Sequence, residues 1–218
     1  MNMWQILYGV MLTSLSSLTF ATVGGAESIQ IMGYDQKAQK LYLTRQYHDQ
    51  SGRVPQLYYY QLNNQQPDKL IEVKSIYKNI DLHSPRAEQH VSKELKKIQS
   101  RLIPLHQQNR QKLHLNVIKT KTSTGDYWQT SHPDDAFQVK KYQQQFLLCQ
   151  QNYGSTIQSS ISYLQPKLNI TQYWQVPQQP VRVAVVSYLG MNVESGYTKE
   201  DPVLLLAQST KTSCKSNP

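Results

Sequence analysis

Alternation of apolar and polar residues with a period of two dominates the first third of the chain. Four short segments show it, separated by polar stretches rich in turn-forming residues: 28–31, 41–47, 57–62 and 70–73. Successive side chains of a β-strand point to opposite faces, so this alternation is typical of strands with one buried face. The pattern predicts a four-stranded antiparallel meander. A meander resembles one blade of a propeller, but no second copy occurs in the sequence, and one blade cannot close a ring.

A single segment changes to the helical period. Ser84 and Pro85 suit the cap and first position of a helix, and apolar residues then recur every three or four positions as far as Leu102. This spacing places the apolar side chains on one face. It predicts an amphipathic helix near 85–103 that ends before Pro104. The opposite face carries four basic residues: Lys93, Lys96, Lys97 and Arg101.

The rest of the chain returns to strand-like patterns, in the segments 113–117, 137–148, 157–163, 168–176, 181–189 and 203–206. The β-branched run 181–189 predicts a central strand. We expect a turn at Gly125–Asp126, a bulge near Lys140–Lys141 where the apolar phase shifts, and a last strand introduced by Pro202. The predicted fold class is α+β and β-rich, a mostly antiparallel sheet with one helix. No linker is long enough to force a split, so we expect one domain over 22–218.

The first 26 residues carry no charged side chain. Trp4 to Phe20 is mostly apolar but is interrupted by five serine and threonine residues, whereas a membrane anchor needs about 20 strongly apolar residues. Small residues then provide two candidate cleavage points, after Ala21 or after Ala26. These features are typical of a secretory signal peptide, which we expect over 1–21. The predicted mature protein is periplasmic or secreted and is not an integral membrane protein.

The two cysteines are Cys149 and Cys214. An even number of cysteines in an exported chain favours a disulfide. In the chain-entropy model, closing a loop of this length stabilises the fold by roughly 4 kcal/mol. The alternative is a buried free thiol at Cys149 and an unpaired one near the carboxyl terminus.

Composition makes the chain basic but otherwise typical of a folded protein. It has 218 residues, 39% hydrophobic and 17% charged, with a formal net charge of +9, which argues against wholesale disorder. Nine basic residues lie between Arg86 and Lys121, opposed only by Glu88 and Glu94. Clustered cations attract polyanions, although a solvated helix face explains the same charges. No known nucleic-acid-binding motif occurs, so no specific nucleic-acid partner is expected.

Motifs for catalysis and metal binding are missing from the sequence. There is no Gly-x-Ser-x-Gly, no phosphate-binding glycine loop and no Cys-x-x-Cys. The six histidines are dispersed without the spacing of a helical metal pair, so we expect no metal and no cofactor. The least unsuitable acid–base candidates are His132, Asp134 and Asp135, where a turn-forming loop explains the same residues.

The sequence favours an exported, non-enzymatic protein that binds a partner through a sheet face and the basic helix. That partner would be a protein or an anionic envelope polymer. Exposed tyrosine can recognise peptides or sugars, and the densest cluster is Tyr58–Tyr60, although such rings also simply cover a sheet. Two alternatives remain open, an envelope hydrolase with an unrecognised site and a polyanion-binding module that uses the 86–121 segment.

Overall fold

The computed structural model describes residues 25–49, 52–78, 80–81, 84–127, 137–190 and 197–207. Within them the elements follow one another as β1 (Ala26–Asp35), β2 (Lys40–His48), β3 (Gln56–Gln61), β4 (Leu70–Glu72), η1 (Ser75–Tyr77), α1 (Pro85–Gln99), β5 (His106–Gln107), η2 (Arg110–Lys112), β6 (His114–Tyr127), β7 (Phe137–Gln150), β8 (Tyr153–Gly154), β9 (Gln158–Tyr163), β10 (Leu168–Gln175), β11 (Val181–Leu189) and β12 (Thr198–Ala207). The predicted β-rich α+β class with one helix is confirmed.

The amino-terminal strands form the predicted meander. Sheet A has the order β1-β2-β3-β4, and each neighbouring pair is antiparallel. Sheet B has the order β5-β10-β11-β12-β8-β7-β6, with β9 paired to β7. Strand β11 lies between β10 and β12, as expected for a central strand.

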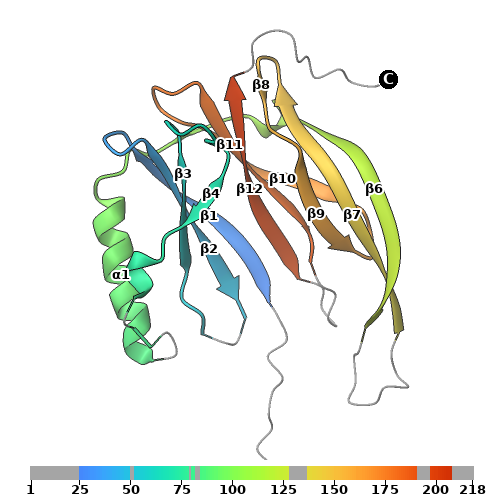
Figure 1. Cartoon of the computed structure of the whole chain (residues 1–218), viewed down its shortest axis with the longest axis horizontal. Coiled ribbons are helices and arrows are strands. Elements are labelled where there is room, and N and C mark those ends of the chain that lie inside the picture. Colours follow the sequence, from blue (N-terminus) through green and yellow to red (C-terminus); the bar gives the residue numbers. More distant parts are fainter. Residues whose placement is uncertain are drawn as a thin grey trace, which may run out of the picture.

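Strands β11 and β12 are buried on both faces, because sheet A covers one face and the β6–β7 hairpin covers the other (Figure 1). On the first face, Val183 and Leu204 share a core cluster with residues of sheet A, among them Leu41. On the second face, Leu205 packs in a separate cluster with Leu148 of β7. Successive residues of β12 are therefore apolar on both faces of the strand, as is required of strands that lie between two other layers.

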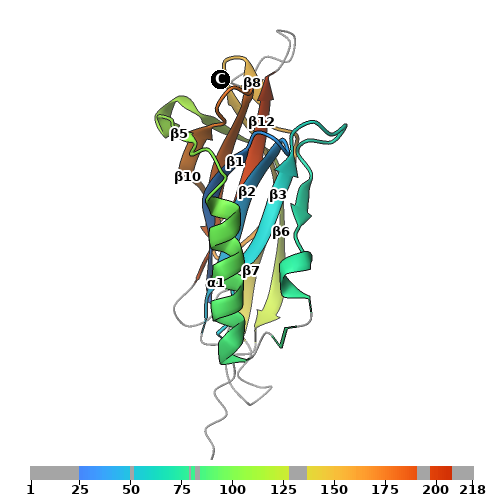
Figure 2. The ribbon, with the colours of Figure 1, turned by 90° about the vertical axis from the view of Figure 1, so that its left-hand side faces the viewer.

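Helix α1 runs along the outside of the molecule beside sheet A (Figure 2). Ala87 and Val91 are buried against Val54 of the loop that precedes β3, which confirms the apolar face. Ser84 holds the N-cap position, but its hydroxyl donates to the backbone carbonyl of Asp81 at 2.7 Å and makes no cap bond to the helix.

The helix is shorter than its apolar repeat suggests, since it ends at Gln99. The chain then turns so that Ile103 and Tyr34 of β1 exchange two backbone hydrogen bonds of 2.9 Å. Leu102 packs on Gly33, where a Cβ would lie 2.7 Å from the Leu102 Cβ and where φ is +148°. The predicted extension of the helix to 103 is wrong, because Leu102, the last residue of the apolar repeat, packs against β1 instead of continuing the helix.

Two local predictions about the hairpin are wrong. Gly125 and Asp126 do not form a turn; they continue β6 and pair with Val139 and Gln138 of β7. The register shift lies between Val117 and Lys119 on β6, not at Lys140–Lys141. Long antiparallel pairing with β7 overrides the weak turn preference of Gly125 in β6.

Pro202 does not introduce the last strand, because it lies inside β12 opposite Val185. Proline lacks an N–H and is tolerated in a strand only where no ladder donor is needed. Its carbonyl accepts a hydrogen bond of 2.9 Å from the buried hydroxyl of Tyr60. A residue that is usually a strand breaker here joins the two sheets.

The predicted signal peptide, 1–21, lies outside the described residues. Ala26, the second candidate cleavage point, is the first residue of β1 and pairs with His48. Among the helices that the structure describes, none has the length and apolarity needed to cross a membrane.

Candidate functional site

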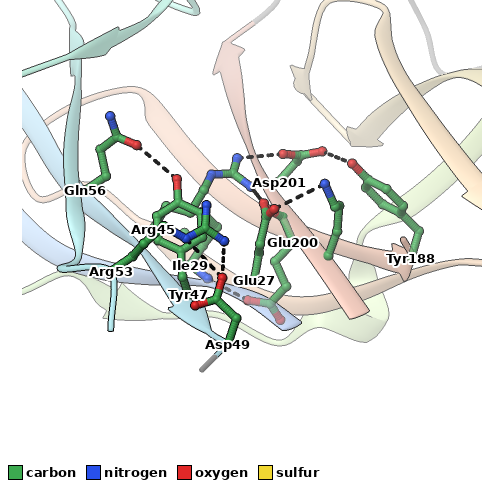
Figure 3. A network of polar contacts seen from close by, with 11 residues as sticks. Glu27, Ile29, Arg45, Tyr47, Asp49, Arg53, Gln56, Tyr188, Glu200 and Asp201 are labelled. Carbon is green, nitrogen blue, oxygen red and sulfur yellow. Dashed lines mark hydrogen bonds and ion pairs between the residues drawn. The ribbon is translucent and has the colours of Figure 1, made fainter. Parts of the chain in front are cut away.

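A network of charged side chains joins the two sheets next to their shared core (Figure 3). Arg45 of β2 alternates in phase with the core residues Leu41 and Leu43, so it points between the sheets. One guanidinium nitrogen lies 2.8 Å from Glu27 Oε2 on β1, and the other lies 2.8 Å from Asp201 Oδ1 on β12. A single cation therefore connects three strands.

Both acidic partners of Arg45 have a second contact. Lys199 Nζ lies 3.1 Å from Glu27 Oε1, and the Tyr188 hydroxyl donates to Asp201 Oδ2 at 2.5 Å. Burial, followed by the Asp201 charge, raises the pKa of Tyr188. Burial alone would lower the pKa of Arg45, but Asp201 and Glu27 outweigh it, so that pKa lies above its ordinary value. Arg45 stays charged and Tyr188 stays a donor at neutral pH.

Glu200 completes the network between the sheets. Its carboxylate accepts the backbone N–H of Ile29 at 2.8 Å and the Thr171 hydroxyl at 3.1 Å, while its carbonyl accepts Arg45 at 3.0 Å. Buried ionic groups are tolerated when they are fully paired. This network is saturated, so its role is to hold sheet A against β12.

A pocket of about 530 Å³ lies beside the network, where sheet A meets the loop before β3 and the η1 segment. Its volume is within the range of small-molecule sites. Its walls are formed by Tyr47, Arg53, Val54, Gln56, Glu72, Lys74, Tyr77 and Lys78.

Tyr77 is held rigidly in one wall of the pocket. Its hydroxyl donates to the Pro55 carbonyl at 2.6 Å and accepts the Leu57 N–H at 2.7 Å. Burial raises the pKa of Tyr77 to about 12, so the phenol is neutral at physiological pH. The ring and the neighbouring Val54 pack towards α1, which supports the wall from behind.

Tyr47 forms another part of the pocket lining. Its hydroxyl donates to Gln56 Oε1 at 2.9 Å, and Gln56 Nε2 donates to Glu72 Oε1 at 2.6 Å. The guanidinium carbon of Arg53 lies 4.0 Å from the centre of the Tyr47 ring, a cation–π contact, and Arg53 also pairs with Asp49 (Figure 3). The single carboxylate of the pocket is therefore already hydrogen-bonded.

Cations outnumber carboxylates around the pocket. Arg53, Lys74 and Lys78 face only Glu72 among the lining residues. No ion pair between described residues involves Lys74 or Lys78. The interior surface of the pocket is mainly apolar. Such walls suit a ligand that combines an apolar body with an anionic group.

The walls of this pocket contain no serine, cysteine or histidine, so they offer no Ser–His or Cys–His pair for nucleophilic catalysis. Within the described part of the chain there is also no cluster of three or more residues able to hold a metal ion.

The structure separates the four basic residues predicted on the helix. Lys97 lies 2.6 Å from Glu94, and Arg101 lies 3.0 Å from Asp35 at the start of the sheet A turn. The two remaining members, Lys93 and Lys96, are exposed and take part in no ion pair between described residues.

The 86–121 segment does not form one continuous basic surface. Lys93 and Lys96 lie on α1, whereas Lys119 and Lys121 lie on β6, and Figure 1 shows these elements on opposite sides of the molecule. The high local charge of the sequence is divided between two distant faces.

Several other sequence candidates fall outside what the structure describes. His132, Asp134 and Asp135 lie between β6 and β7 in the undescribed stretch 128–136, and Cys214 lies beyond β12. Cys149 is 1% exposed on β7. The Cys149–Cys214 disulfide and the acid–base site stay predictions.

Sequence reasoning did not single out the pocket residues. One signal was available in the alternation of β2. Arg45 and Tyr47 occupy the same face of the strand as Leu41 and Leu43, so side chains with polar groups occur at positions where the alternation predicts core residues. Lys74, Tyr77 and Lys78 had no such signal, because only the path of the chain after β4 brings them to β2.

The tyrosine cluster is divided between two faces, as strand geometry predicts. Tyr60 is buried between the sheets with Tyr58 packed against the same cluster. Tyr59 lies on the other face, with its ring 5.8 Å from that of Tyr42 and with Lys40 over it. Two of the three rings therefore cover the core.

Comparison with protein-family models, curated proteins and solved structures finds no match for this chain.

Proposed function

We propose that the protein is an exported, non-enzymatic binding module of the cell envelope. Its binding site is the pocket between Tyr47 and Tyr77, and its ligand is an apolar group that carries one anionic group. The observation that carries this proposal is the combination of a 530 Å³ apolar interior with Arg53, Lys74 and Lys78 at its walls.

The construction of the pocket supports binding rather than catalysis. Tyr77 and Gln56 are fixed by hydrogen bonds to the protein, so the walls are preorganised, and preorganisation lowers the entropic cost of binding. The cations at the walls attract an anion and orient it, while the tyrosine rings contact the apolar body.

Export rests on the uncharged leader, and one packing contact favours the earlier of its two cleavage points. A Cβ at Gly25 would lie 2.4 Å from the carbonyl oxygen of His48, so Gly25 packs tightly on the end of β2. Cleavage after Ala21 keeps this residue and all of β1, and we propose that site over the one after Ala26.

Ligand chemistry can be tested with two small probes that differ in charge. We expect 3-phenylpropionate to shift the backbone NMR signals of residues around Tyr47 and Tyr77, with a dissociation constant on the order of millimolar for so small a ligand. The neutral analogue 3-phenylpropanol should bind at least several-fold more weakly. A K74Q/K78Q variant should weaken phenylpropionate binding roughly 5- to 20-fold, since each exposed charge contributes up to about 1 kcal/mol.

The matched control is K93Q/K96Q, which removes the same charge from α1 outside the pocket. It should leave phenylpropionate binding unchanged. Equal weakening by both variants, or equal binding of the neutral probe, would contradict an anion site in the pocket.

Export is tested separately on protein isolated from the expressing cells. The intact mass should lack the first 21 residues, and thiol labelling without reduction should be negative because of the predicted Cys149–Cys214 disulfide. A mass that includes Met1, or a labelled thiol, would contradict the corresponding part of the proposal.

A further inference from the structure

Strand β6 ends sheet B with a long edge that no described strand covers. It is a 14-residue strand whose ladder is with β7. The other terminal strands differ: β4 has three residues, β5 has two and β9, which pairs with β7, has six, while β1 lies against β12. Within the described chain, β6 therefore offers the longest open edge.

Open edges present unpaired N–H and C=O groups, and folded proteins usually shorten or cover them. Residues 117–124 of β6 are all exposed. Two of them are large and apolar, Val117 at 46% and Ile118 at 51% exposure. They lie at the register shift of β6, near the half of the hairpin that packs on the core.

The same edge is positively charged. Lys119 and Lys121 share one face of β6, and Lys140 and Lys141 lie on the adjacent β7. No ion pair between described residues involves any of the four. The only acidic residue in the sequence of either strand is Asp126, near the hairpin tip.

We propose that β6 binds an extended acidic segment of a partner protein, which adds to sheet B as a further strand. Main-chain hydrogen bonds to the open edge would supply affinity, as in other cases of strand addition. Acidic side chains two residues apart in the added strand lie on one face and can pair with Lys119 and Lys121 together.

Charge argues for an acidic segment and against a second copy of this chain. Antiparallel pairing of two β6 strands around their centre places Lys119 and Lys121 of both copies close together. Like charges on neighbouring strands destabilise pairing, and edge lysines are a common means of preventing self-association. A strand that carries glutamate or aspartate removes that repulsion. The β6 edge lies away from the pocket lined by Tyr47 and Tyr77, so this proposal is independent of the proposed function.

The test uses a dye-labelled, capped nine-residue peptide of alternating threonine and glutamate, with glutamine in place of glutamate as the neutral control. Fluorescence anisotropy should show binding of the acidic peptide that weakens with added salt. K119E/K121E should weaken it at least 10-fold. K93E/K96E on α1 makes the same change in net charge at a remote surface and should change it less than 2-fold.

Hydrogen exchange distinguishes strand addition from simple charge attraction. Bound peptide should slow exchange of the β6 amides within 117–124, and the K119E/K121E variant should lose this protection while its β11 amides stay protected. Equal weakening by K93E/K96E, or binding without slower exchange in 117–124, would overturn the proposal. Dimerisation through β6 in sedimentation experiments would overturn it in favour of a second copy.

Discussion

Sheet B contains two long antiparallel pairs that differ in what surrounds them. Strands β11 and β12 form the middle layer of the molecule, and apolar side chains cover both of their faces. The β6–β7 hairpin joins the second core cluster through Phe146 and Leu148 of β7, whereas β6 is exposed from 117 to 124. Each pair contains one strand rich in β-branched residues, β11 and β6, so strand propensity alone does not separate the pairs.

The comparison shows that β pairing and burial are separate properties. A ladder forms wherever two strands alternate in register, and the hairpin does so with threonine, lysine and glutamine. Apolar burial contributes most of the stability. We therefore expect the middle layer to govern unfolding and the outer edge of the hairpin to be free for recognition.

The largest expected effect comes from truncating the middle layer. L204A and L205A remove side chains that face two different clusters, and each should lower the free energy of unfolding by about 2–5 kcal/mol. V117A, on the exposed part of β6, should change it by about 0.5 kcal/mol or less. Urea denaturation of the three variants checks the comparison.

If L204A lowered the free energy of unfolding strongly and L205A only slightly, the core cluster between β12 and the β6–β7 hairpin would contribute little to stability. Only the face of β12 towards sheet A would then matter for the stability of the fold. If V117A lowered the free energy of unfolding as much as L204A or L205A, the exposed part of β6 would make contacts that the fold needs.

A smaller effect is expected from breaking the link between the two sheets. R45M removes a guanidinium whose side chain is 15% exposed and leaves the carboxylates of Glu27 and Asp201 without it. We expect a loss of about 2–4 kcal/mol, because unpaired buried charges are costly. Thermal or urea unfolding measures it.

R53M is the matched control, since Arg53 pairs with Asp49 but is 47% exposed. It should cost about 1 kcal/mol or less. A loss from R45M no larger than that from R53M would show that the apolar core alone holds the sheets together.

The smallest effect is a decrease of stability at alkaline pH. Burial raises the pKa of Tyr60, whose hydroxyl is hydrogen-bonded between the sheets, and that of Tyr77 to about 12. In the unfolded chain these phenols ionise near pH 10. The unfolded state therefore releases protons first, and the free energy of unfolding should be unchanged below pH 10 and fall between pH 10 and 12. Urea midpoints at pH 8.5, 10 and 11 measure the decline.

Y60F should reduce the slope of that decline, because it removes one of the buried phenols. At pH 8.5 it should cost about 1 kcal/mol through the lost hydrogen bond to Pro202. An unchanged alkaline slope in Y60F would show that Tyr60 does not contribute to the pH dependence.

Much of the fold could be predicted because it is local in sequence. The period-two alternation of 28–73 identified the meander, and the apolar spacing at Ala87 and Val91 identified the helix face. The β-branched run 181–189 identified the central strand. Each of these patterns records which side of an element is buried.

Errors arose where a distant contact overrides a local preference. The helix stops at Gln99 because Leu102 packs on Gly33, and Gly125 stays in a strand because β7 pairs with it. The same limit applies to the site. Tyr47 and Tyr77 lie in different elements, and no spacing in the sequence relates them.

The sequence by itself determined the amino-terminal meander, the apolar face of the helix, the central strand and the excess of positive charge. Tertiary structure alone decided that Arg45 meets Glu27 and Asp201, that Tyr47 and Tyr77 enclose a pocket, and that the lysines of α1 and β6 lie on opposite sides. The physical reason is that hydrophobic periodicity depends on neighbours a few residues apart. Ion pairs, pockets and open edges depend on how complete sheets pack against each other.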